Sequence, residues 1–150
     1  MIYKYGDMFE DRHDKDTWTL FTGNSYVNKN DELVMGRGAA LQAKKIWPAL
    51  PKFLGMIIAN DCGHLGDYYL IGDGIMRVGV FQVKRHFKSP AALDIINHSA
   101  RTLVSWATAS PQLTFNLNYP GIGYGRLTVG EVEPLLQYLP DNVHVWRFKE

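Results

Sequence analysis

Hydrophobic and polar positions follow two different periods along the chain, and the change of period marks the predicted elements. Residues 17–22 are β-branched or aromatic almost throughout, which predicts a buried strand. Between residues 38 and 47 the apolar positions recur at helical spacing, and Pro48 ends the run. A second helix is expected over residues 50–59, with Pro51 close to its start.

Strands and helices continue to alternate in the second half of the chain. Residues 68–71 and 75–83 are predicted to form a hairpin whose turn is Gly72-Asp73-Gly74. Ser89 and Pro90 resemble the N-cap and first residue of a helix that reaches about residue 108. The remaining predictions are a first strand ending at residues 3–5, a strand at 113–117, a helix at 129–139 and a last strand at 142–148.

This order of elements predicts the fold class. Alternating strands and helices with one central hairpin are typical of an α/β domain, with a mixed sheet covered by helices on both faces. A chain of 150 residues fits one such domain, so we expect residues 1–150 to fold as a single unit. Ligands of such sheets bind outside the C-terminal ends of the strands.

Composition excludes several classes of protein. The chain is 46% hydrophobic and 21% charged, as globular proteins are, and no apolar run approaches the ~20 residues of a membrane-spanning helix. The start of the chain has no apolar signal core, and Cys62 is the single cysteine, so we expect a cytoplasmic protein without disulfides. The five histidines show no metal-ligand spacing, so neither a metal nor a cofactor is expected.

Net charge limits the partners. With 16 basic and 15 acidic residues the chain carries +1, which argues against a general binder of duplex nucleic acid. An RNA-binding module remains an alternative that rests on the aromatic residues and on Lys84-Arg85-His86. The four tryptophans fall on predicted strands and helices and are expected in the core: Trp18, Trp47, Trp106 and Trp146.

Two glycine-rich segments each follow a predicted strand and precede a helix. The first runs Met35-Gly36-Arg37-Gly38-Ala39, and the second runs Pro120-Gly121-Ile122-Gly123-Tyr124-Gly125-Arg126. Glycine lets a ligand approach the backbone, and the helix that follows offers free N–H groups to an anion. Neither segment matches a dinucleotide fingerprint or a Gly-Lys-Ser/Thr phosphate loop. Two ordinary turns are the alternative to a shared diphosphate site.

Two charged positions are further candidates. Lys84 closes a predicted strand, and it is either a solvated strand end or a pocket residue that binds phosphate or acts as a nucleophile. In the pocket, burial and the adjacent Arg85 would lower its pKa. Asp7 follows Gly6 after the first strand, where it is either a turn residue or an acceptor for the amino group of a base.

The sequence resembles the macrodomain family over nearly its whole length. The matching segments are Gly6-Asp7-Met8-Phe9, Thr22-Gly23-Asn24, residues 34–42, residues 81–87 and residues 119–127. The resemblance is strongest to bacterial antitoxin macrodomains and terminal ADP-ribose protein glycohydrolases, which have a lysine where Lys84 stands. It implies a three-layer α/β/α sandwich that binds ADP-ribose at the strand ends.

The resemblance also implies the roles of individual residues. Asp7 would accept from the adenine amino group, Met8 would offer its backbone, and Phe148 would pack on adenine. Asn24 would face the distal ribose, and Lys84 would attack or stabilise its anomeric carbon. Residues 36–39 would line the distal ribose and the diphosphate, with Met35 beside them, and residues 120–126 would wrap the diphosphate.

Two functions remain open from the sequence. The first is hydrolysis of ADP-ribose from a modified protein or nucleic acid, or processing of a derivative such as its 1″-phosphate. The second is a non-catalytic ADP-ribose reader, since the second glycine segment lacks the carboxylate that some lysine-using relatives carry there. In either case the protein is expected to act as a monomer, away from membranes.

Overall fold

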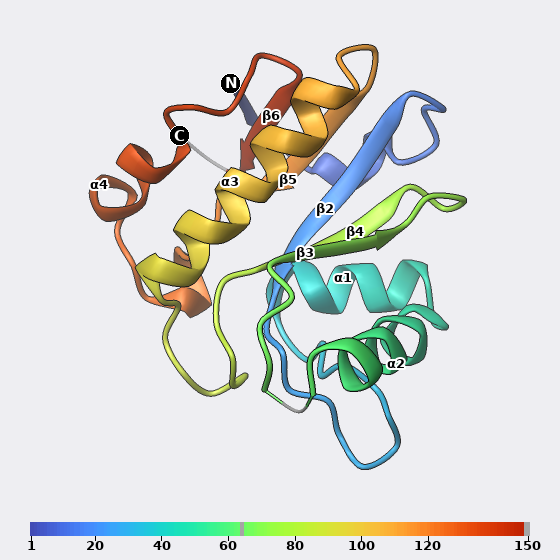
Figure 1. Ribbon diagram of the computed structural model, residues 1–150. Helices are drawn as coiled ribbons and strands as arrows, with labels where there is room; N and C mark the ends of the chain where they lie inside the picture. Colours follow the sequence, from blue (N-terminus) through green and yellow to red (C-terminus); the bar gives the residue numbers. More distant parts are fainter. Residues whose placement is uncertain (64, 149–150) are drawn as a thin grey trace.

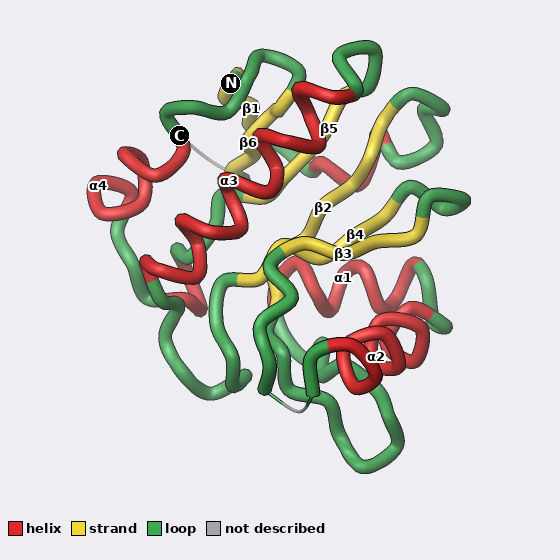
Figure 2. Tube along the Cα trace, in the orientation of Figure 1, coloured by secondary structure: helices red, strands yellow, loops and turns green. Residues whose placement is uncertain are grey.

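The chain forms three layers, with one sheet between two groups of helices (Figure 1). The computed structural model describes residues 1–63 and 65–148. Figure 2 shows the strands gathered in the middle of the molecule, with helices on either side. The strands are β1 (Ile2–Tyr5), β2 (Thr17–Gly23), β3 (Leu70–Asp73), β4 (Val78–Gln82), β5 (Thr114–Asn118) and β6 (Val143–Arg147).

The helices differ in length and in type. The α-helices are α1 (Gly38–Ile46), α2 (Leu50–Asp61), α3 (Leu93–Ala109) and α4 (Val129–Val132). The 3₁₀-helices are η1 (Met8–Asp11), η2 (Gly123–Gly125) and η3 (Glu133–Leu136). Among these described helices, none is long and apolar enough to cross a membrane.

The sheet has the order β1-β6-β5-β2-β4-β3, and its pairs are parallel except for β3 with β4. It is therefore a mixed sheet with one antiparallel edge strand, as predicted. Successive side chains of a strand point to opposite faces, so each central strand contributes to two cores. Leu20 packs with α3, whereas its neighbour Phe21 packs with α1 and α2.

The connections that follow the neighbouring strands β2 and β5 leave to opposite faces of the sheet. After β2 it enters α1 and α2, which cover one face, and after β5 it enters α4, which packs with α3 on the other face. Adjacent parallel strands whose connections leave to opposite faces form a crevice at their C-terminal ends, which is the usual ligand site of such sheets. The fold therefore places a candidate site at the ends of β2 and β5.

The hairpin turn differs from its prediction. Gly72 and Asp73 belong to β3, and the turn comprises the residues that follow, where Ile75 is 90% exposed. The Asp73 carboxylate accepts hydrogen bonds from the backbone N–H groups of Ile75 (2.8 Å) and Met76 (3.4 Å). An aspartate can fold the backbone ahead of it in this way, and the turn comprises residues 74–77 instead of 72–74.

Two predicted helices also have different bounds. Ser89 and Pro90 lie in a loop, because the N–H groups of Ala91 and Ala92 bond outside the helix, to Gly125 and Val83, and α3 starts only after them. The helix predicted over residues 129–139 is α4 followed by η3, with Pro134 at the junction. Proline lacks the N–H that would continue an α-helix.

Candidate ligand-binding site

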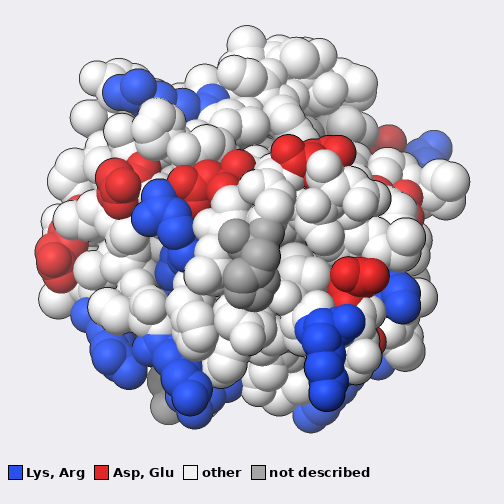
Figure 3. Space-filling model, turned by 60° about the horizontal axis from the view of Figure 1, so that its bottom comes forward, with Lys and Arg blue, Asp and Glu red and all other residues white. Residues whose placement is uncertain are grey.

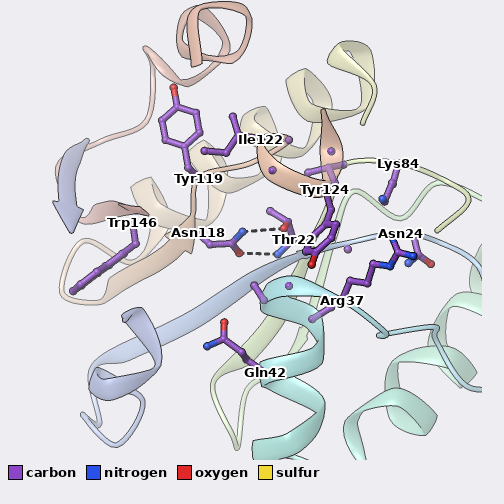
Figure 4. Close-up of a pocket in the computed structure, with 18 of the residues that line it drawn as sticks. Thr22, Asn24, Arg37, Gln42, Lys84, Asn118, Tyr119, Ile122, Tyr124 and Trp146 are labelled. Carbon is purple, nitrogen blue, oxygen red and sulfur yellow. Dashed lines mark hydrogen bonds between the residues drawn. The ribbon is translucent and has the colours of Figure 1, made fainter. Parts of the chain in front are cut away.

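A cavity of about 950 Å³ opens at the C-terminal ends of the parallel strands. Figure 4 shows it bounded by the two glycine-rich segments, with Trp146 and Tyr119 towards one end and Lys84 and Asn24 towards the other. Predicted site residues that line it are Asp7, Met8, Asn24, Gly36, Arg37, Gly38, Ala39, Lys84, Gly121, Ile122, Gly123, Tyr124, Gly125, Arg126 and Phe148.

Two predicted site residues do not line this cavity. Met35 is 3% exposed and packs in the core with α1 and α2, so only its neighbours Val34 and Gly36 reach the cavity wall. Pro120 is buried, and the segment enters the wall at Gly121. In both segments the first residue anchors the backbone and the glycines that follow approach the cavity.

The two glycine-rich segments contact each other across the cavity. The guanidinium carbon of Arg37 lies 5.5 Å from the centre of the Tyr124 ring, a cation–π distance. The same ring covers Gly38, whose ideal Cβ position is 3.5 Å from the tyrosine Cδ2. Figure 4 shows these side chains meeting over the middle of the site. The contact joins loops that are far apart in the sequence.

Both segments also present backbone to the cavity. Helix α1 begins at Gly38 without a side-chain cap, and Ala39 and Ala40 in its first turn line the wall. The free N–H groups and positive dipole of a helix N-terminus favour an anion there. Gly121 has φ of +83°, a conformation that side-chain-bearing residues rarely adopt, and a Cβ at this position would also require the Ile96 side chain on α3 to shift.

Lys84 lies two residues beyond the end of β4 and is half-buried at one end of the cavity. Its ammonium nitrogen donates a hydrogen bond to the backbone oxygen of Phe87 over 3.1 Å. Burial lowers the pKa of Lys84, and the positive charges of Arg126 and Arg37 lower it further. A larger fraction of this amine is therefore neutral at a given pH than for an ordinary lysine.

Arg85 does not contribute to that shift, contrary to the expectation from its position. Its side chain turns away from the cavity and forms an ion pair with Asp67, with N–O distances of 3.0 and 2.7 Å. The two neighbouring side chains therefore have different surroundings, with Lys84 at the cavity and Arg85 against Asp67. The cations that act on Lys84 come from the two glycine-rich segments instead.

Asn24 and Asp7 both use their side chains in local structure. The Asn24 side chain is 5% exposed, donates to the Val34 oxygen (3.0 Å) and accepts from the Tyr26 N–H (2.8 Å). The Asp7 carboxylate caps η1 by accepting from the Phe9 N–H over 3.0 Å. Asn24 thus ties the loop after β2 to the residue directly before the first glycine-rich segment, and Asp7 caps η1 beside the cavity.

A side-chain pair joins β2 and β5 at the base of the cavity. The Asn118 amide accepts from the backbone N–H of Thr22 and donates to the Thr22 hydroxyl, both over 2.9 Å, as Figure 4 shows. Backbone pairing of these two strands ends at Leu20 with Leu117. Asn118 therefore provides a hydrogen-bond acceptor for the Thr22 N–H at the point where the two strands separate.

Several lining residues were not predicted. They lie at strand ends or in the loop after Lys84: Thr22, Phe87, Lys88, Asn118, Tyr119, Trp146 and Arg147. Trp146 was expected in the core, and it does pack against the core on one side while its other side faces the cavity. Strand alternation could have identified it, because Val145 points to the opposite face.

The described residues that line the cavity include five cations and one carboxylate: Arg37, Lys84, Lys88, Arg126 and Arg147 against Asp7. None of these cations forms an ion pair within residues 1–63 and 65–148. The cavity is thus locally positive although the chain carries only +1. Figure 3 shows basic and acidic side chains both present on one face of the molecule. No group of three or more His, Cys, Asp or Glu side chains suited to a metal ion occurs in the described part of the chain.

No protein-family model and no curated protein matches the sequence, whereas solved structures do. The macrodomain of Thermus aquaticus DarG is 22% identical with a TM-score of 0.75, and the match covers 99% of this chain and 97% of that one. For the macrodomain of Mycobacterium tuberculosis DarG the identity is 23%, the TM-score 0.68 and the coverage 97% of both chains. Thermosipho africanus DarTG, solved in complex with ADP-ribose, is 20% identical with a TM-score of 0.69, over 97% of this chain and 41% of that one.

Proposed function

The chain has the macrodomain fold, and we propose that it binds ADP-ribose in the cavity and releases it by hydrolysis from a modified macromolecule. The structural neighbour solved with ADP-ribose supports the choice of ligand. The cavity supports it independently, since it combines an aromatic end, a positive centre with helix N–H groups and a half-buried lysine. These features suit a base, a diphosphate and a reactive sugar in that order.

The orientation of the ligand follows from the two ends of the cavity. Trp146, Asp7 and Phe148 suit an aromatic base with an exocyclic amine. The diphosphate lies between the glycine-rich segments, against the start of α1. The distal ribose then reaches Lys84, and its anomeric carbon, C1″, faces the amine.

The position of Lys84 is the observation that carries the proposal of catalysis. A neutral amine that donates one N–H to the Phe87 oxygen is held in place while its lone pair stays available. In the proposed reaction this amine attacks C1″ or stabilises the positive charge that develops there. The bond from C1″ to the macromolecule breaks, its electron pair leaves with the macromolecule, and that group takes up a proton. Water then adds its oxygen to C1″, any C1″–Nζ bond breaks with its electron pair returning to the amine, and the proton that the water loses balances the one taken up by the macromolecule.

Incubation with ADP-ribosylated protein, ADP-ribosylated DNA and ADP-ribose 1″-phosphate tests this function directly. Wild-type protein is expected to release ADP-ribose from at least one of them, and Lys84→Ala to lose about 100-fold or more in rate, as for loss of a general base or nucleophile. Arg85→Ala is the matched control, because Arg85 is the next residue but pairs with Asp67 outside the cavity. Equal turnover by Lys84→Ala removes the lysine from the mechanism.

A non-catalytic reader is the second candidate function. This function is favoured by the lack of an acid near Lys84. Among the described residues that line this end of the cavity, none has a carboxylate that could protonate a leaving group or deprotonate a water molecule. Calorimetry with free ADP-ribose separates the two functions. Stoichiometric binding, together with no release from any of the three substrates, identifies a reader.

A further inference from the structure

Trp146 and Asn116 are linked by a hydrogen bond beneath the aromatic end of the cavity. The indole Nε1 of Trp146 donates to the side-chain oxygen of Asn116 over 2.9 Å. The two residues come from neighbouring parallel strands, β6 and β5, and lie on the sheet face that also carries η1. Trp146 lines the cavity, while Asn116 lies below it and is only 1% exposed.

The backbone around Trp146 leaves its ring accessible from the cavity. Gly6 lies against it, and an ideal Cβ on this glycine would be 3.6 Å from the indole Cζ3. Gly6 has φ of +129°, which side-chain-bearing residues rarely adopt, and its N–H bonds to the Arg147 oxygen over 2.8 Å. The chain leaving β1 therefore passes the edge of the indole, and both Gly6 and Trp146 line the cavity.

The Asn116 amide is used on one side only. Its oxygen binds Trp146, but its Nδ2 group has no hydrogen-bond partner within the described residues, although it is buried. A buried donor without a partner costs folding free energy, and an apolar side chain at this position would avoid the cost. Fold stability alone therefore does not account for an asparagine here, whereas its contact with Trp146 does.

We propose that Trp146 is the platform on which the base of the ligand stacks, and that Asn116 is a positioning residue that holds the indole in place. This proposal rests on the proposed binding of ADP-ribose. Because the indole N–H is committed to Asn116, Trp146 offers the base a ring surface and no hydrogen bond. Phe148, for which the sequence resemblance implied packing on adenine, is 71% exposed at the rim.

The platform therefore binds bases without distinguishing them. A stacking surface tolerates any flat ring, whereas a hydrogen bond to the exocyclic amine distinguishes adenine from hypoxanthine. In this arrangement Asp7 reads the base edge and Trp146 supplies affinity. Removal of the platform should weaken ADP-ribose and inosine diphosphate ribose equally, and should leave a base-free probe such as ribose 5-phosphate unchanged.

Calorimetry with these three ligands tests the platform. Trp146→Leu is expected to weaken both nucleotide ligands about 5- to 150-fold, the range found for loss of one stacked base. Trp146→Phe keeps an aromatic ring and should cost only a few-fold. Trp106→Phe, whose ring packs on Trp18 away from the cavity, is the matched control. If Trp146→Leu binds ADP-ribose as tightly as wild type, the platform is wrong; if wild type itself fails to bind, the proposed function is wrong instead.

A double-mutant cycle tests the positioning role of Asn116. Asn116→Leu should weaken ADP-ribose in the wild-type background, yet have no further effect in Trp146→Phe, which has no indole N–H to hold. It should also leave the melting temperature unchanged or raise it, since it removes the unpaired buried amide. Two results would assign Asn116 a structural role only. One is that the effects of the two substitutions on affinity add. The other is that Asn116→Leu lowers the melting temperature and weakens binding of ribose 5-phosphate as well as of ADP-ribose. Should Asn116→Leu fail to fold, that too contradicts the proposal, and the Trp146 variants still decide the platform.

Discussion

The ammonium nitrogen of Lys84 donates a hydrogen bond to the backbone oxygen of Phe87, three residues further along the chain. The lysine that carries the proposed chemistry is thus held by its own loop, and no carboxylate within residues 1–63 and 65–148 forms an ion pair with it. Within that loop, the Lys88 N–H donates to the His86 Nδ1 over 3.1 Å, and the ring of Phe87 stacks on His86. The position of the amine therefore depends on a short segment that folds on itself.

The pH dependence of ADP-ribose release should report the charges around Lys84. Burial, then Arg126 and Arg37, lower the pKa of this amine, so its neutral form becomes available at lower pH. Arg126→Gln removes one repelling charge, raises the pKa of Lys84 and should move the rising limb of the pH–rate profile to higher pH. Rates measured across pH with Arg85→Gln as the control check this, and an unmoved profile would contradict the role of Arg126.

The contact between Arg37 and Tyr124 should control how long the ligand stays bound. Tyr124→Ala removes the ring that joins the two glycine-rich segments, and cation–π contacts at exposed sites stabilise by about 0.5–1 kcal/mol. Dissociation of ADP-ribose should accelerate about 2- to 5-fold, with little change in the association rate. Stopped-flow measurements provide both rates. A matched change in association instead would show that the contact shapes the entrance.

Gly55→Ala should destabilise the fold strongly for its size. A Cβ on Gly55 in α2 would collide with the backbone oxygen of Asp31 and lie 2.7 Å from the Leu33 nitrogen. Overpacking of this kind costs about 1–3 kcal/mol. Gly130→Ala in α4 is the control, because its Cβ would meet nothing closer than 4.0 Å and alanine favours the helix. Urea unfolding should show a lower free energy of unfolding for Gly55→Ala and a higher one for Gly130→Ala. Equal changes in the two variants would contradict the close packing at Gly55.

The ion pair between Asp67 and Arg85 should stabilise the fold only at moderate and high pH. Burial alone raises the pKa of Asp67, but hydrogen bonds from Arg85 and Gln82 outweigh it and hold this pKa below its usual value. The contribution is therefore present above the unfolded-state pKa of about 4 and is lost as the pH falls through the folded-state value.

Asp67→Asn should consequently lower the free energy of unfolding at pH 7 by about 1 kcal/mol or less, since Arg85 is half-exposed. At pH 2–3 the variant and wild type should converge. Thermal melts across this range measure the difference, and a gap that persists at low pH would mean that the carboxylate charge is not the cause.

Local sequence patterns were sufficient for most of the fold. The strand predicted at residues 17–22 and the helix that begins at Gly38 appear within a residue or two of their expected bounds, because their periodicity matches their burial. The start of α3 was missed because it depends on bonds from Ala91 and Ala92 to partners in other segments. No local pattern records such distant partners.

Some residues of the candidate site could likewise be predicted from local sequence, and others could not. Glycines before helix starts, and a lysine at a strand end, stand out in the sequence, and the structure brings them to one cavity. Their roles towards a ligand remain predictions. Asn118 and Trp146 were missed because their importance depends on neighbours in space: Thr22, from which Asn118 is separated by 96 positions, and Asn116, from which Trp146 is separated by 30.

The pair formed by Asn118 and Thr22 completes the hydrogen bonding between β2 and β5 below the ligand site without any residue of the loops above. Because a side-chain amide takes the place of backbone pairing where β5 leaves β2, the Thr22 N–H and hydroxyl keep hydrogen-bond partners at the edge of the cavity. Substitutions in the loops above can then alter which molecule is held, and the strands below need not shift to accommodate them. A chain with this join can diverge far in sequence at its binding surface and still fold the same way.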